Sequence, residues 1–182
     1  MVRASTGRRA DIVRAAREIL DSEGADAVTM RAVAARLGIR APSLYNHVPG
    51  KQALENLLIS DGFEELTSAL LGALEGAAGR DVVVIGRAYR AFAQRRPHLY
   101  RLMTERELDR EGLTPGVESA AARPLVEALH GDETRARAVF AFMHGMVTLE
   151  LNRRFPPGAD LDAAWTVGLA RLAADPTTPP VS

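Results

Sequence analysis

The chain has 182 residues, 47% hydrophobic and 25% charged, which is the composition of an ordinary soluble globular protein. The absence of cysteine excludes a disulfide framework and any thiolate metal site. No continuous apolar run reaches the length of about 18 residues that a membrane span needs, and the charged N-terminus lacks the apolar core of a secretory signal. We therefore expect a cytoplasmic protein without membrane association.

The net charge is zero, but the charge is unevenly distributed along the chain. Residues 1–57 hold nine basic and six acidic side chains, a net charge of +3, whereas the remainder holds fourteen basic and seventeen acidic ones, a net charge of −3. A basic first segment followed by a slightly acidic body is typical of a protein whose N-terminal part faces phosphate groups.

Apolar residues recur at spacings of three and four along most of the chain, which predicts an all-α fold. Only the VVVI run within residues 81–85 resembles a strand, and it opens a longer helical pattern. The predicted helices are 7–22, 30–37, 41–48, 51–76, 81–95, 98–104, 115–130, 132–154 and 161–174. Between them, the polar segment 105–116 is predicted to be a mobile loop, and the Pro-rich segment 175–182 a disordered tail.

Residues 29–47 have the pattern of a helix-turn-helix, in which two short helices cross at a large angle. Ala34 provides a small residue where the helices approach, and Gly38 tolerates the left-handed backbone of the turn. Apolar anchors lie on both sides of the turn: Val33, Leu37, Ile39 and Leu44. The alternative is a plain helical hairpin whose polar face is only solvated.

The first 58 residues or so resemble the DNA-binding domain of TetR-type repressors. The shared pattern is Thr-x-Arg-x-Val-Ala-x-x-Leu-Gly-Ile from Thr29, then Ser-Leu-Tyr-x-His-Val from Ser43, then Lys51 at the start of a long helix. Segment 144–155, followed by Ala163-Ala-Trp165, is similar to the C-terminal region of a TetR subgroup. The resemblance implies a helix-turn-helix domain over residues 1–50 and a helical ligand-binding and dimerisation domain over residues 51–174.

The resemblance also implies roles for individual residues. Positions that contact DNA phosphates in the family are matched by Thr29, Tyr45, His47 and Lys51. Positions at or near base edges are matched by Arg31, Arg40, Ala41, Pro42, Ser43 and Asn46. The chemistry agrees, because arginine pairs with guanine and asparagine with adenine in the major groove, and the amides of a helix N-terminus favour a phosphate beside Lys51. Tyr45 could instead belong to the core, His47 could cap its own helix, and Arg31 could pair with Asp26.

The last two long helices are the expected interface of a homodimer, which would bring two recognition helices to successive major grooves. The candidate interface residues are Phe142, Met146, Leu149, Trp165, Leu169 and Leu172. The alternative is that this apolar surface belongs entirely to the core of the monomer.

The middle helices are predicted to enclose a pocket for an unknown small-molecule effector. A mostly apolar wall with a few polar groups is typical of such sites, and it is also typical of a core. The candidates are Phe63, Leu66, Leu70, Tyr89, Phe92, His98, Tyr100, Met103, Phe140, Met143 and His144. The histidines lack metal-ligand spacing, so neither a metal nor a cofactor is expected.

These features together predict a DNA-binding transcriptional regulator, most simply a repressor that a small molecule releases from a palindromic operator. Enzyme motifs such as G-x-S-x-G and H-E-x-x-H are absent from the sequence, so no catalytic residue is assigned. The alternatives are an enzyme, or a helical protein that binds small molecules without a role on DNA. An activator of the same family is a third, because sequence does not separate activators from repressors.

Overall fold

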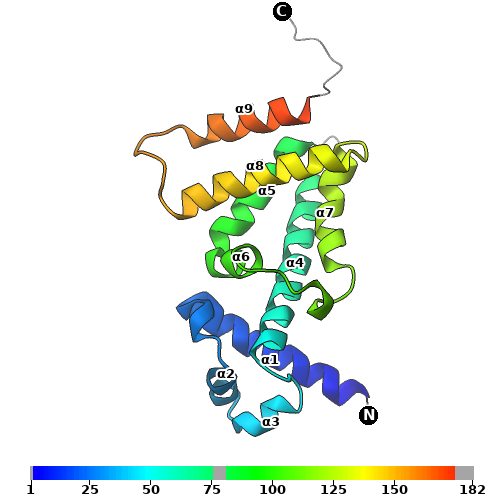
Figure 1. The fold of residues 1–182 in the computed structure, drawn as a ribbon, viewed down its shortest axis with the longest axis vertical. Coiled ribbons are helices and arrows are strands. Elements are labelled where there is room, and N and C mark those ends of the chain that lie inside the picture. The colour runs from blue at the N-terminus through cyan, green and yellow to red at the C-terminus, as the bar shows by residue number, and fades with distance from the viewer. Residues whose placement is uncertain (1, 76–80, 175–182) are drawn as a thin grey trace, which may run out of the picture. The chain divides into compact units, whose positions relative to one another are not determined.

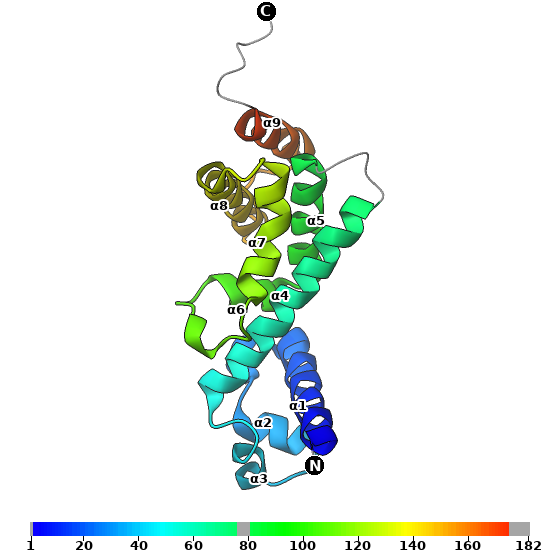
Figure 2. The same cartoon turned by 90° about the vertical axis from the view of Figure 1, so that its right-hand side faces the viewer.

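The computed structural model describes residues 2–75 and 81–174, with side chains from Arg8 onward, and all regular structure in these ranges is helical (Figures 1 and 2). The predicted tail at 175–182 lies outside the described residues. The elements are α1 (Val2–Glu23), a 3₁₀ turn η1 (Ala25–Ala27), α2 (Met30–Arg36), α3 (Ala41–Tyr45), α4 (Lys51–Glu75), α5 (Val82–Arg95), α6 (Pro97–Thr104), a 3₁₀ turn η2 (Arg110–Gly112), α7 (Val117–Ala128), α8 (Glu133–Leu151) and α9 (Leu161–Ala173).

The chain packs as two compact units that interleave along the sequence. Unit 1 comprises Met1–Glu64 and Arg96–Glu118, and unit 2 comprises Glu65–Arg95 and Ser119–Ser182. This division differs from a single boundary at residue 50, because the first half of α4 and all of α6 pack with the N-terminal helices.

The core of unit 1 is built where α1 meets its neighbours. Ile12, Ala16 and Leu20 of α1 are fully buried, as the helical spacing predicts. Helix α1 packs against η1, α2 and α6. Apolar side chains of α2, α3, α4 and α6 complete this core: Val33, Leu44, Leu54, Leu58 and Leu99.

In unit 2, α5, α8 and α9 pack against one another in pairs. Two glycines allow the close approach of these helices. A Cβ on Gly86 of α5 would lie 2.3 Å from a methyl of Leu169, and one on Gly168 of α9 would lie 2.1 Å from the ring of Phe142. Since real Cβ contacts are essentially never this short, a side chain at either position would require Leu169 or Phe142 to repack.

The connection 105–116 between α6 and α7 differs from the predicted mobile loop. It contains η2, which Asp109 caps by accepting from the Gly112 amide at 3.3 Å. The Asp109 carboxylate also accepts from Asn56 Nδ2 of α4 at 2.8 Å, and the Thr114 amide donates to Ser60 Oγ at 2.9 Å. The segment is therefore hydrogen-bonded along the first half of α4, within unit 1.

Candidate nucleic-acid interface

The helix-turn-helix begins with a side-chain cap on α2, as predicted. Thr29 Oγ1 accepts a hydrogen bond from the Ala32 amide at 3.1 Å, and the Thr29 side chain is exposed. The turn that follows passes through Gly38, whose φ of 66° lies in the left-handed region. A hydrogen bond from the Ile39 amide to the Ala34 carbonyl, 3.0 Å long, closes the turn. The local signals in the sequence thus place α2 and the turn correctly.

Helix α3 buries one face and exposes the other. Leu44 of α3 is fully buried, as is Val48 in the turn after the helix, whereas Tyr45 is 51% exposed. The alternative that Tyr45 belongs to the core is therefore wrong. The other predicted contact residues Arg31, Arg40, Pro42, Ser43, Asn46, His47 and Lys51 are exposed, and Ala41 is half-buried. The helix ends at Tyr45 rather than at residue 48.

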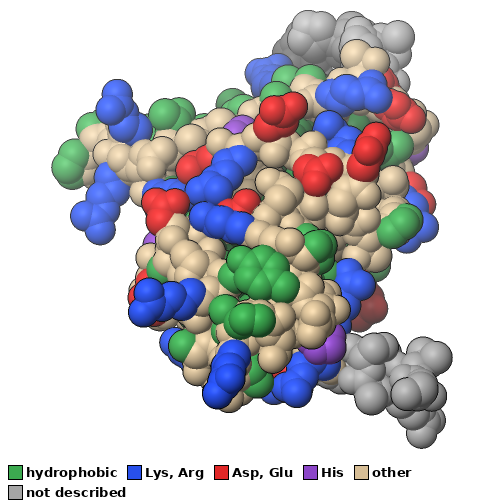
Figure 3. Space-filling model, turned by 60° about the horizontal axis from the view of Figure 1, so that its bottom comes forward, with side chains coloured by type: hydrophobic (Ala, Val, Ile, Leu, Met, Phe, Trp, Pro, Cys, Tyr) green, Lys and Arg blue, Asp and Glu red, His purple; other side chains and the backbone are tan. Residues whose placement is uncertain are grey.

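The helix-turn-helix contributes no carboxylate to its own surface, because no Asp or Glu occurs between Ala27 and Leu54. On the lower part of the face shown in Figure 3, exposed charges are mainly Lys and Arg. Asp26, the acidic neighbour considered for Arg31, pairs instead with Arg106, with 3.3 Å between Asp26 Oδ1 and Arg106 Nη2. A cationic surface with few carboxylates is what binding to a phosphate backbone requires.

A row of buried polar side chains on α4 was not foreseen from the sequence. Glu55, Asn56 and Ser60 are all buried among apolar neighbours on α4. Glu55 Oε1 lies 3.0 Å from Arg106 Nη1 and 3.7 Å from Lys51 Nζ. The only sequence signal was the presence of three polar residues at adjacent helical positions within an otherwise apolar run.

The predicted dimer-interface residues occupy different environments in unit 2. Trp165 and Leu169 are buried in its core, and the ring of Phe142 packs edge-on against Trp165 with centroids 5.9 Å apart. Met146 and Leu172 are half-buried, and Leu149 is exposed. The remaining exposed apolar surface of α8 and α9 consists mainly of small residues that sequence reasoning did not select: Ala138, Ala141, Ala163, Ala164, Val167 and Ala170.

Most of the predicted pocket residues are buried side chains in their own unit. Leu66, Leu70, Tyr89, Phe92, Tyr100, Met103 and Met143 are buried, and Phe63, His98 and His144 are half-buried. Phe140 is exposed; its ring stacks on His144 at 6.1 Å and meets Tyr89 edge-on at 6.2 Å.

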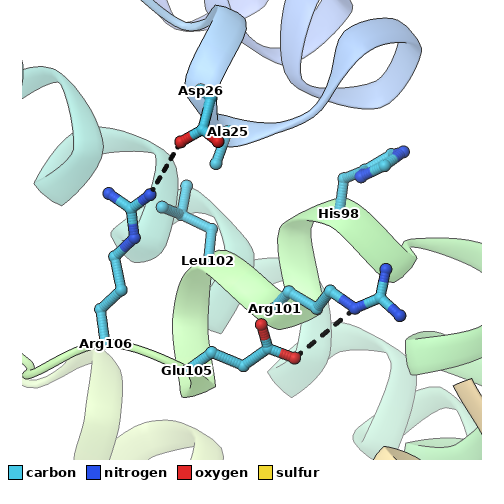
Figure 4. A pocket seen from close by; sticks show the side chains of 7 residues that line it. All are labelled: Ala25, Asp26, His98, Arg101, Leu102, Glu105 and Arg106. Carbon is cyan, nitrogen blue, oxygen red and sulfur yellow. Dashed lines mark hydrogen bonds and ion pairs between the residues drawn. The ribbon is translucent and has the colours of Figure 1, made fainter. Parts of the chain in front are cut away.

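A pocket of about 240 Å³ lies in unit 1, between η1 and α6 (Figure 4). Of the predicted pocket residues it includes His98, and its wall is mostly charged: Ala25, Asp26, His98, Arg101, Leu102, Glu105 and Arg106. Its charged side chains pair with one another, Arg101 with Glu105 at 3.5 Å and Arg106 with Asp26.

Within 2–75 and 81–174 no helix is both long and apolar enough to cross a membrane. In the same ranges, no three His, Asp or Glu side chains gather in a way that could hold a metal ion.

The capped α2, the Gly38 turn and the exposed polar face of α3 define a helix-turn-helix protein. Comparison with known proteins agrees. Residues 12–58 match the family described as "Bacterial regulatory proteins, tetR family", and residues 82–172 match "Tetracyclin repressor-like, C-terminal domain". The chain belongs to the tetR family and is a DNA-binding transcriptional regulator, not an enzyme.

Similar proteins cover nearly the whole chain. An uncharacterized HTH-type transcriptional regulator of Mycobacterium tuberculosis, Rv0681, is 33% identical over 91% of this chain and 80% of its own length. The uncharacterized regulator YobS of Bacillus subtilis is 27% identical over 82% of each chain. The crystal structure of the putative regulatory protein SCO4313 superimposes with a TM-score of 0.74 at 26% identity, covering 94% of this chain and 98% of that one.

Proposed function

We propose that the protein is a repressor that binds a palindromic operator as a homodimer, with α3 of each copy in the major groove. The observation that carries this proposal is the division between buried and exposed side chains in α3 and the turn after it: Leu44 is buried, whereas Tyr45, Asn46 and His47 are exposed. Arg40 and Ser43 extend the same exposed surface at the start of the helix. Such a surface can contact base edges and phosphate oxygens together.

The homodimer is supported by the exposed apolar face of α8 and α9 in unit 2. Leu149 and Val167 are exposed large apolar residues on these two helices. The same two helices also expose five alanines, Ala138, Ala141, Ala163, Ala164 and Ala170, and a Cβ built on Gly145 of α8 would meet no atom within 4 Å. Because small side chains let two helices approach closely, this face suits packing against the same face of a second copy.

The proposed effector is a small molecule that lowers the affinity of the dimer for its operator. The aromatic group Tyr89, Phe140 and His144 of unit 2 supports this part of the proposal, since an exposed Phe140 ring beside a histidine can stack on an apolar ligand.

The test is selection of the purified protein against a pool of random DNA duplexes at low and at moderate salt. A dimeric reader is expected to enrich a palindrome whose half-sites lie about one helical turn of DNA, or a multiple of it, apart. Failure to enrich any sequence, with negligible binding even at low salt, would reject the proposed function.

Two substitutions should separate sequence reading from phosphate binding. Arg40→Ala should relax preference at one base position of each half-site by about 1–3 kcal/mol, because a guanidinium pairs with guanine in two hydrogen bonds. Lys51→Ala should instead weaken binding to all duplexes alike and reduce the slope of log affinity against log salt by about 1. Selections repeated with each variant check both results, and an unchanged sequence preference in the Arg40 variant would remove Arg40 from the readout.

A further inference from the structure

The starting point is a buried carboxylate shared by two cations. The Glu55 side chain is only 9% exposed, and Oε1 lies 3.0 Å from Arg106 Nη1 and 3.7 Å from Lys51 Nζ. A buried carboxylate is costly unless a positive charge compensates it. Glu55 therefore retains at least one of the two cations in any folded state.

The two cations differ in their other possible partners. Lys51 is the first residue of α4 and follows the turn after α3, so it is the proposed phosphate ligand. The Glu55 carboxylate, 3.7 Å from the Lys51 ammonium, partly neutralises it and repels a phosphate beside it, so a second cation on Glu55 strengthens phosphate binding by Lys51. Arg106 follows α6 in sequence, and both terminal nitrogens of its guanidinium have partners. Nη1 donates to Glu55 at 3.0 Å, and Nη2 donates to Asp26 at 3.3 Å, the second pair being drawn in Figure 4.

Arg106 is held near Glu55 by the connection 105–116. Three residues further along, Asp109 accepts from the buried Asn56, and Gly112 packs so closely on Asn56 that a Cβ would lie 1.8 Å from its Nδ2. These contacts place the guanidinium beside Glu55 independently of DNA.

We propose that Arg106 is a positioning residue for DNA binding, which compensates the buried Glu55 and so leaves Lys51 available to a backbone phosphate. The inference rests on the proposed function, because it requires that Lys51 binds phosphate. Without Arg106, Glu55 would keep Lys51 as its only compensating cation among the ion pairs described around it. The protein would then release about one counterion fewer from DNA for each copy bound.

The experiment measures binding of the full-length protein to radiolabelled duplexes of random sequence, over a range of salt concentrations. In a plot of log affinity against log salt, we expect the slope for Arg106→Ala to be shallower than that of the unmodified protein by about 0.9 per copy. At about 0.1 M salt, this difference corresponds to about an eightfold loss of affinity per copy. The matched control is Arg110→Ala, which removes the same charge from the same segment but pairs with Glu118, 2.9 Å away, on the surface. It should leave the slope unchanged.

The decisive variant is Glu55→Gln combined with Arg106→Ala. Since a neutral glutamine does not hold Lys51, the double variant should recover the slope and affinity of the unmodified protein, which a merely structural role of Arg106 would not produce. Circular dichroism checks folding, and Arg106→Gln replaces Arg106→Ala if the latter does not fold.

Equal slopes for the Arg106 and Arg110 variants would overturn the inference, and so would the absence of recovery in the double variant. If Lys51→Ala still makes the slope shallower, either result leaves the proposed function intact. If Lys51→Ala leaves the slope unchanged, the phosphate role of Lys51 fails and the inference fails with it. If the unmodified protein binds no duplex at low salt, the proposed function is itself rejected.

Discussion

Replacing Glu150 by alanine is expected to lower the free energy of unfolding by about 3–5 kcal/mol. Glu150 Oε2 accepts from Arg90 Nε at 2.9 Å and from Gln94 Nε2 at 3.0 Å, and Oε1 accepts from the Trp165 indole N–H. The carboxylate thus joins α5, α8 and α9, and its side chain is only 8% exposed. Truncation would leave the indole N–H of the buried Trp165 without its acceptor and would remove the partner of Arg90 Nε.

The matched control is Asp162→Ala. Asp162 pairs with the same guanidinium, but its side chain is 88% exposed. Because exposed ion pairs contribute little, we expect a loss within about 1 kcal/mol. Urea denaturation followed by circular dichroism, at one fixed protein concentration, measures both variants. Equal losses from the two would contradict the assigned role of Glu150.

The carboxylates of Glu150 and Asp162 also affect the pKa of Arg90. Burial opposes its charge, but hydrogen bonds to Asp162 and Glu150 outweigh that effect and raise the pKa of Arg90 above its usual value. Arg90 also lies over the Trp165 ring, 5.6 Å from its centroid. Glu150 and Asp162 thus both stabilise the charged form of Arg90.

The second large effect is expected from Leu149→Glu on α8. Leu149 belongs to the proposed homodimer interface, where the substitution would bury a carboxylate of each copy without a compensating charge. A monomer binds only one half-site and loses the gain in affinity that comes from holding two half-sites at once. The affinity for the operator should therefore fall by about 10²–10⁴-fold. Sedimentation velocity and operator binding together measure the effect.

Leu71→Glu is the control for Leu149→Glu. Leu71 of α4 and Leu149 have nearly equal exposure, 42% and 41%, and the two substitutions add the same charge to unit 2. We expect the Leu71 variant to remain a dimer with unchanged operator affinity. A Leu149 variant that sediments as a dimer and binds as before would place the interface elsewhere.

The helix-turn-helix was predictable because its signals are local. The Thr29 cap, the Gly38 turn and the burial of Leu44 each depend on residues within one or two helical turns. The valine run at the start of α5 is helical, since Val82, Ile85 and Tyr89 lie at helical spacing and are buried on one face. Helical periodicity therefore outweighed the preference of β-branched residues for strands.

The parts that could not be predicted depend on contacts between distant segments. On α8 and α9 the large apolar residues were assigned to a partner, but Trp165 and Leu169 are buried within unit 2. Periodicity identifies an apolar face without saying what covers it. Likewise, the polar row on α4 is satisfied by a segment about fifty residues away, which helical spacing alone does not reveal.

Trp165 is the single tryptophan of the chain, and it lies beside the Glu150 carboxylate and under the Arg90 guanidinium. Its intrinsic fluorescence therefore reports on unit 2, and the helix-turn-helix contributes no indole emission. Comparing the unfolding curve from indole emission with the one from total helix content would reveal whether the two units melt in one cooperative step. The protein thus carries a built-in optical probe for that question, with no label required.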